Sequence, residues 1–147
     1  MSCYTTFFII SKEDFKKLQE DKSMLIDAAK SAIELISINS QGDFAALTEG
    51  MYDFDDYTEV HKSHWDKIYS NYIDLQDDLK NRLKKCEAIY NRLTSRDELE
   101  DICDEMEEIK QNLSILESYK DKLGMVFDIL EDLTWRKSDY TIVVYEG

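Results

Sequence analysis

The chain has 147 residues, of which 43% are hydrophobic, and 18 Lys and Arg stand against 32 Asp and Glu, giving a net charge of −14. This length fits one domain with a sizeable core, and the hydrophobic content is too high for a disordered chain. The excess of carboxylates disfavours nucleic acid and anionic membranes as direct partners, because phosphate binding needs clustered Lys and Arg. We therefore expect a single domain over residues 1–147 whose favoured partners are basic proteins.

Several absences in the sequence bear on compartment and architecture. No stretch approaches the roughly 20 apolar residues of a membrane span, and the first residues lack the basic and apolar regions of a secretory signal. Three Cys, an odd number outside any short motif, are typical of reduced thiols. We expect a cytoplasmic protein, and because Pro is absent we expect long uninterrupted helices.

The first predicted elements are a strand and a helix. Residues 4–10 are β-branched or aromatic throughout, which predicts a strand that is covered on both faces. Ser11, with Asp14 three residues later, resembles the N-terminal cap of a helix. We predict a helix over residues 12–37, because apolar residues recur there at helical spacing: Phe15, Leu18, Leu25, Ala29, Ala32 and Ile36.

Residues 39–57 interrupt this pattern. Gly42 and Gly50 punctuate the segment, and Phe44–Thr48 has the composition of a short helical turn. We predict an irregular acidic segment here, long enough when extended to run back along the preceding helix.

Two long helices joined by a short turn are predicted over residues 58–93 and 96–135. Thr94 or Ser95 caps the second helix. Apolar residues recur every three or four positions in both, as in a coiled-coil seam, so the helices are expected to pack as an antiparallel hairpin. The predicted seam consists of Trp65, Ile68, Tyr72, Leu75, Leu79, Arg82, Cys86, Ile89 and Leu93 on the first helix and Leu99, Ile102, Met106, Ile109, Leu113, Leu116, Lys120, Leu123, Phe127 and Leu130 on the second.

A second strand is predicted over residues 140–145, with Ile142–Val144 at its centre. The predicted fold is therefore mainly α: a long antiparallel helical hairpin, a third N-terminal helix, and short N- and C-terminal β-strands that form a small sheet. If the two strands do not meet within one chain they must pair between molecules, because an isolated two-stranded sheet is marginally stable. A homodimer through the terminal strands is therefore a hypothesis.

Acidic and aromatic residues alternate just before the first long helix. Residues 43–59 contain no Lys or Arg, so the charge of this segment is uncompensated. Charge steers a partner and aromatic side chains anchor it, which makes the segment a candidate surface for a basic protein; alternatively, its aromatics cover the bundle and its acids face water. The candidate partner-binding residues are Tyr52, Asp53, Phe54, Asp55, Asp56, Tyr57 and Glu59.

Charge is also distributed unevenly along the hairpin near its turn. Residues 79–93 are mainly basic, whereas residues 97–108 contain eight acidic residues and no basic one. We expect ion pairs between the two helices there. A secondary acidic face, formed by Asp101, Asp104, Glu105 and Glu108, lies on one side of the second helix by its spacing and is predicted to be solvated or to dock a partner. A magnesium site would need a second set of carboxylates on a facing helix.

The two histidines, His61 and His64, are spaced so that Asp53, Asp56 or Glu59 could complete a metal site. Zinc needs three or four ligands in a defined geometry, and surface histidines are the simpler interpretation. We therefore predict no metal ion.

Nucleophilic chemistry has no support in the sequence. Cys86 and Cys103 fall within about one turn of each other along the predicted hairpin, where a disulfide is conceivable, but we expect buried, reduced thiols there. No pairing of a nucleophile with a base and no Gly-rich phosphate loop is present, so we predict neither catalytic residues nor a cofactor.

Three functions are compatible with these patterns. The first is a non-enzymatic acidic inhibitor of a basic nucleic-acid-handling protein, of the phage anti-defence, immunity or antidote type. The second is a structural or adaptor coiled coil that oligomerises through its terminal strands. The third is a metal-dependent all-α nucleotide hydrolase built on the carboxylates. We predict the first, because net charge and the aromatic–acidic segment support it and no catalytic pattern supports the third.

Overall fold

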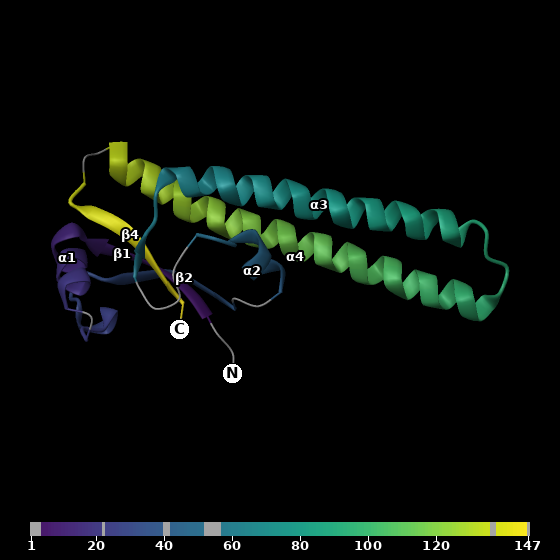
Figure 1. The fold of residues 1–147 in the computed structure, drawn as a ribbon, viewed down its shortest axis with the longest axis horizontal. Helices are drawn as coiled ribbons and strands as arrows, with labels where there is room; N and C mark the ends of the chain where they lie inside the picture. The colour runs from purple at the N-terminus through teal and green to yellow at the C-terminus, as the bar shows by residue number, and fades with distance from the viewer. Residues whose placement is uncertain (1–3, 22, 40–41, 52–56, 136–137, 147) are drawn as a thin grey trace.

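The computed structural model describes residues 4–21, 23–39, 42–51, 57–135 and 138–146. A long helical hairpin projects from a four-stranded antiparallel sheet, as Figure 1 shows, and the predicted fold class is confirmed. In chain order the elements are β1 (Tyr4–Ser11), α1 (Lys12–Glu20), the 3-10 helix η1 (Ile26–Ala28), β2 (Ile33–Asn39), α2 (Asp43–Leu47), β3 (Thr58–Glu59), α3 (Lys62–Tyr90), α4 (Arg96–Trp135) and β4 (Tyr140–Glu146).

The predicted first strand and helix start are confirmed, but the helix over 12–37 is wrong beyond residue 20. Ser11 caps α1 by accepting a hydrogen bond from the amide of Asp14 at 3.1 Å. After α1, Asp21 Oδ1 accepts hydrogen bonds from the amide of Ser23 at 3.1 Å and from its hydroxyl at 2.6 Å. This local turn competes with continued helix. Residues 33–39, rich in β-branched Ile, instead pair with β1 as β2.

The sheet brings the two terminal strands together within one chain. The strand order is β2-β1-β4-β3, and β1 pairs antiparallel with β4 in a register that sets Phe7 opposite Val144 and Ile9 opposite Ile142. Both edges of β1 are therefore occupied, by β2 on one side and β4 on the other. The homodimer stays a prediction, but β1 has no free edge through which to form it.

The segment before the hairpin contains more regular structure than predicted. α2 forms at the predicted helical turn, while residues 40–41 and 52–56 lie outside the described residues. The first long helix begins at Lys62 rather than at residue 58, because Thr58 and Glu59 pair with β4 as β3, and the amide of Val60 donates to the carbonyl of Ile142 at 2.8 Å. That helix ends at Tyr90, and α4 has the predicted bounds.

The hairpin seam is confirmed for most of its residues. Leu99 is half-buried and is not among the residues that pack against the core, and three further positions differ from the prediction. Arg82 is exposed and the neighbouring Leu83 packs against the core instead. Ile89 is 46% exposed near the turn. Lys120 lies at the edge of the seam with its ammonium 5.0 Å from the centroid of the Tyr72 ring, so its stem is covered while its charge stays near water.

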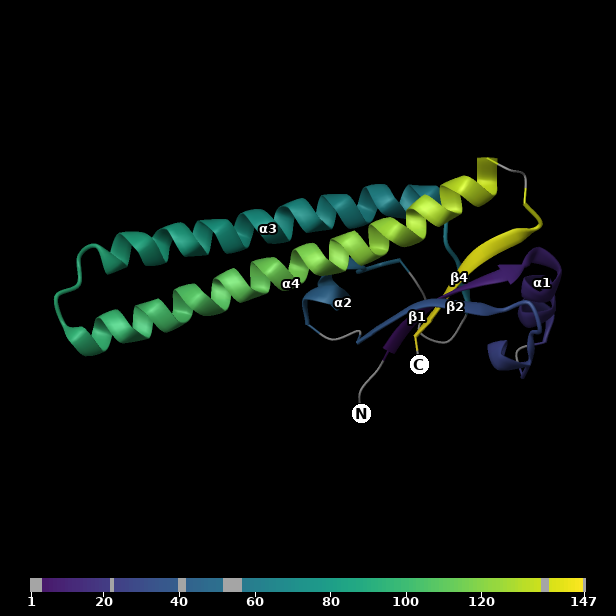
Figure 2. The same ribbon diagram turned by 180° about the vertical axis from the view of Figure 1, so that it is seen from behind.

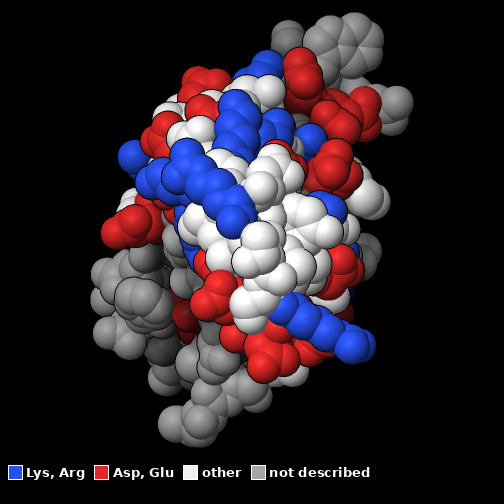
Figure 3. All heavy atoms as spheres, turned by 90° about the vertical axis from the view of Figure 1, so that its right-hand side faces the viewer, with Lys and Arg blue, Asp and Glu red and all other residues white. Residues whose placement is uncertain are grey.

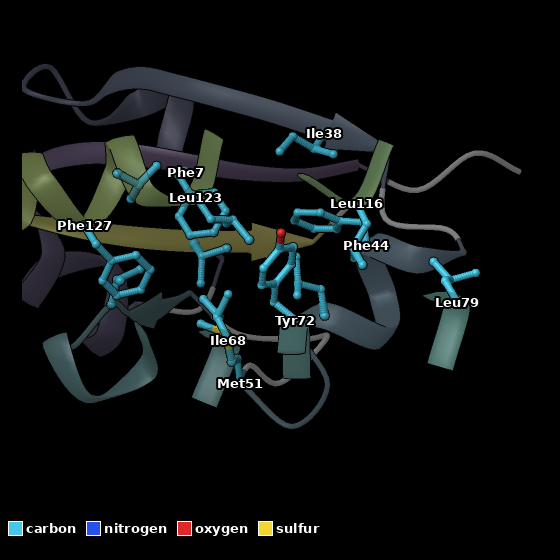
Figure 4. Packing of buried hydrophobic residues seen from close by; sticks show 14 of the residues in the cluster. Phe7, Ile38, Phe44, Met51, Ile68, Tyr72, Leu79, Leu116, Leu123 and Phe127 are labelled. Atoms are coloured by element: carbon cyan, nitrogen blue, oxygen red, sulfur yellow. The ribbon is translucent and has the colours of Figure 1, made fainter. Parts of the chain in front are cut away.

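The core lies where the base of the hairpin meets the sheet. Figure 4 shows Phe7 of β1, Phe44 of α2 and residues of both long helices gathered there, and Phe7, Phe44, Ile68, Leu116 and Leu123 are fully buried. A smaller cluster on the other face of the sheet contains Ile10, Phe15, Leu18, Ile26, Ala29 and Val143. The sheet is thus covered on both faces, as predicted. Figures 1 and 2 show the tip half of the hairpin projecting beyond α2 and the sheet. Among the described residues, no helix is long and apolar enough to cross a membrane.

Candidate functional site

The secondary acidic face lies on the projecting half of α4. Asp101, Asp104, Glu105 and Glu108 are all exposed, and none forms an ion pair within 4.0 Å of a described residue. Figure 3 looks onto the tip of the hairpin, where most of the visible Lys and Arg side chains gather on one side of an uncharged centre, another extends on the opposite side, and carboxylates lie around them. The face therefore offers four uncompensated carboxylates on a rigid helical support.

The expected ion pairs between the two helices near the turn are not formed. Across 57–135, where every residue is described, no basic side chain of 79–93 lies within 4.0 Å of a carboxylate, and the one pair of this region joins Arg96 to Glu100 within α4 at 3.6 Å. Long exposed side chains gain little from pairing in water and lose conformational freedom by it. The basic and acidic stretches thus remain available to other molecules.

Two thiols flank the acidic face. Both thiols are free, as predicted, and Cys86 is buried in the seam. The predicted burial of Cys103 is wrong, because its position on α4 lies beside the seam and is exposed. Burial raises the pKa of the Cys86 thiol, and the negative charge of Glu105 raises it further. Cys86 is therefore a core residue, and Glu105 stands at the border between the acidic face and the seam.

Most of the predicted aromatic–acidic surface lies outside the described residues, namely Tyr52, Asp53, Phe54, Asp55 and Asp56. Its two described members serve the fold. The ring of Tyr57 lies 4.7 Å from that of Tyr145, and its hydroxyl accepts a hydrogen bond from the amide of Ile26 at 3.0 Å. Glu59 accepts a hydrogen bond from the Thr141 hydroxyl at 3.1 Å.

A hollow of about 640 Å³ opens beside Tyr57 and Glu59, at the junction of α1, β3 and the start of α3. It is lined by Lys12, Phe15, Lys16, Gln19, Tyr57, Thr58, Glu59, His61 and His64. Two lysines and two histidines thus face one carboxylate in the described lining of a strongly acidic protein. No sequence pattern signals this cluster, because its members come from three elements that only the folded sheet brings together.

The two histidines interact with each other. The backbone amide of His61 donates a hydrogen bond to Nδ1 of His64 at 3.1 Å. Burial lowers the pKa of the His64 imidazole, and the charge of His61 lowers it further. Among the described residues no group of three His, Cys, Asp or Glu side chains could hold a metal ion.

Comparison of the chain with protein-family models, with curated proteins and with solved structures finds no match. The candidate sites therefore rest on the geometry of this chain alone.

Proposed function

We propose that the chain is a non-enzymatic interaction protein that binds a basic nucleic-acid-handling protein and inhibits it. The observation that carries the proposal is the acidic face on α4: four exposed carboxylates on the half of the hairpin that projects beyond the sheet. None of the four forms an ion pair with a described residue, and Glu105 also interacts with the Cys86 thiol. A partner with clustered Lys and Arg would find complementary charge there without displacing an existing ion pair.

The rigidity of the support favours the same function. The seam of the projecting half is closed by buried residues of both helices, among them Leu79, Cys86, Ile102 and Ile109. Carboxylates on a packed helix keep their backbone spacing. Binding therefore has to order fewer flexible groups of this chain. Such a face can occupy a surface that normally receives phosphates, which is how binding would become inhibition.

An affinity capture from a lysate of the source cells, at low and at high salt, tests the proposal with the full chain. We expect one basic nucleic-acid-handling protein to be recovered at low salt and to be lost or weakened at high salt. The activity of that protein should then fall when the chain is added. Recovery of the chain alone, or of structural proteins indifferent to salt, would contradict the proposal.

A second candidate function, an adaptor that oligomerises, is favoured by one observation. β2 stands at the edge of the sheet with a described neighbour on one side only, and its Ile33 is 62% exposed. An open edge strand can accept a strand from another chain. A concentration-dependent increase in mass by light scattering, abolished by Ile33→Lys, would support this function.

A further inference from the structure

The hollow beside β3 differs in charge from the rest of the molecule. Lys12 and Lys16 of α1 line it, and neither ammonium lies within 4.0 Å of a described carboxylate. Lys17, the next residue of the same helix, does not line the hollow and instead contacts Glu13 at 3.8 Å and Asp14 at 4.0 Å. On α1, therefore, the two lysines without a described ion-pair partner, Lys12 and Lys16, line the hollow. Lys17, which has such partners, does not.

The single carboxylate in the described lining is already engaged. Glu59 accepts the hydrogen bond from Thr141 and lies 3.7 Å from Nε2 of His61. The Glu59 carboxylate therefore already interacts with Thr141 and His61. The described lining consequently has an excess of positive charge, in contrast to the net charge of −14 of the whole chain.

The start of α3 adds hydrogen-bond donors to the same hollow. No acidic residue occupies the first turn of α3, although positions there are the usual place for Asp or Glu. Because Nδ1 of His64 accepts the amide hydrogen of His61, the neutral ring carries its own hydrogen on Nε2 and is a donor there. Gln19 of α1 contributes a side-chain amide from the opposite element.

We propose that this hollow binds the phosphoryl group of a small organic phosphate. A phosphoryl group, with three acceptor oxygens and up to two negative charges, can accept hydrogen bonds from two ammonium groups, an imidazole N–H and a side-chain amide, and it carries more charge than a carboxylate. The volume of about 640 Å³ far exceeds that of inorganic phosphate and lies in the usual range for small-molecule sites. The half-buried Tyr57 provides aromatic surface for the organic part.

Titration of the full chain, followed by amide shifts in NMR spectra, tests this site with three probes: inorganic phosphate, glycerol 3-phosphate and adenosine monophosphate. We expect adenosine monophosphate to bind most tightly and to shift the amides of α1, of residues 57–59 and of the first turn of α3. Tightest binding by inorganic phosphate would overturn the role given to the organic part. No saturable shift with any probe would overturn the site.

Charge-matched variants separate the site from general electrostatics. The double variant Lys12→Met, Lys16→Met should weaken adenosine monophosphate binding by about tenfold or more. The control double variant Lys17→Met, Lys30→Met, at two exposed lysines outside the described lining, should change it less than about twofold. Equal losses in the two variants would overturn the proposal. If the first double variant does not fold, the single variant Lys16→Gln, at an exposed side chain, replaces it and should weaken binding by about threefold or more.

Discussion

The base and the tip of the hairpin use the same two helices differently. At the base the seam is buried and so are positions beside it, such as Val126, because the sheet and α2 cover that face. At the tip the buried residues are confined to the seam, and the positions beside it carry exposed charge, including Asp101, Glu105 and Glu108. Figure 1 shows α2 and the sheet beside the base of the hairpin, whereas the tip extends beyond them.

This difference indicates a division of labour within one element. Burial of apolar surface is the main source of folding free energy. The base of the hairpin packs against the sheet and α2, so it supplies most of this free energy. The tip needs only enough packing to stay helical, and its remaining surface is free to carry charge. A surface that contributes little to stability can be specialised for a partner.

The largest expected effect distinguishes base from tip by stability. Leu123→Ala at the base removes a fully buried side chain and should lower the free energy of unfolding by about 2–5 kcal/mol. Leu113→Ala, the same substitution at a half-buried seam position nearer the tip, should cost about 1–2 kcal/mol. Urea denaturation followed by circular dichroism measures both. A loss at Leu113 equal to or greater than that at Leu123 would contradict the division.

The two thiols of the hairpin should differ in their rate of chemical modification, which is the second and smaller expected effect. Cys86 is buried and its thiol pKa is raised by burial and by Glu105, so at pH 8 it holds less of the reactive thiolate than an ordinary Cys. Cys103 is exposed on the outside of α4. In a Cys3→Ser background, iodoacetamide should modify Cys103 faster than Cys86, by on the order of tenfold or more. Mass spectrometry over time gives the two rates, and comparable rates would show that the seam opens readily.

The smallest expected effect concerns pH at the base. Because the pKa of His64 is lowered from its ordinary value of 6.5, the folded state favours the neutral ring, whose Nδ1 accepts the His61 amide. The stabilisation is present above pH 6.5 and is lost as the pH falls toward the lowered pKa. An NMR titration of the imidazole should give a midpoint below 6.5, and His64→Gln should flatten the pH dependence of unfolding in this range. A midpoint above 6.5 would contradict the burial of the ring.

The hairpin was predictable because its signal is local and long. A periodicity repeated over many turns fixes both helices and most of the seam, and the error at Arg82 is a shift of one residue to Leu83. The terminal strands were likewise evident from their β-branched composition. The pairing of these two strands within one chain was not evident from the sequence. It depends on residues 33–39, which return along the sheet as β2.

The prediction was wrong, or made no statement, where contacts between residues far apart in the chain determine the structure. Residues 33–39 have apolar spacing compatible with a helix, and pairing with β1 determines the outcome. The hollow brings together the lysine pair Lys12 and Lys16 and the histidine pair His61 and His64. These two pairs lie far apart in the sequence. The acidic face, by contrast, was predictable from spacing on one helix, and the structure adds that its carboxylates have no described ion-pair partner within 4.0 Å.

The most direct test of the proposed binding face compares three immobilised forms of the full chain in one lysate. The first is unchanged, and the second carries Asp101→Asn, Asp104→Asn, Glu105→Gln and Glu108→Gln. The third, a control with the same change in net charge, carries Asn in place of four exposed acids of α3, which are Asp66, Asp74, Asp77 and Asp78. Quantitative mass spectrometry should find a basic protein recovered equally by the first and third forms and reduced by about tenfold or more with the second. Equal recovery by all three forms, or equal loss with both variants, would contradict the assignment of binding to this face.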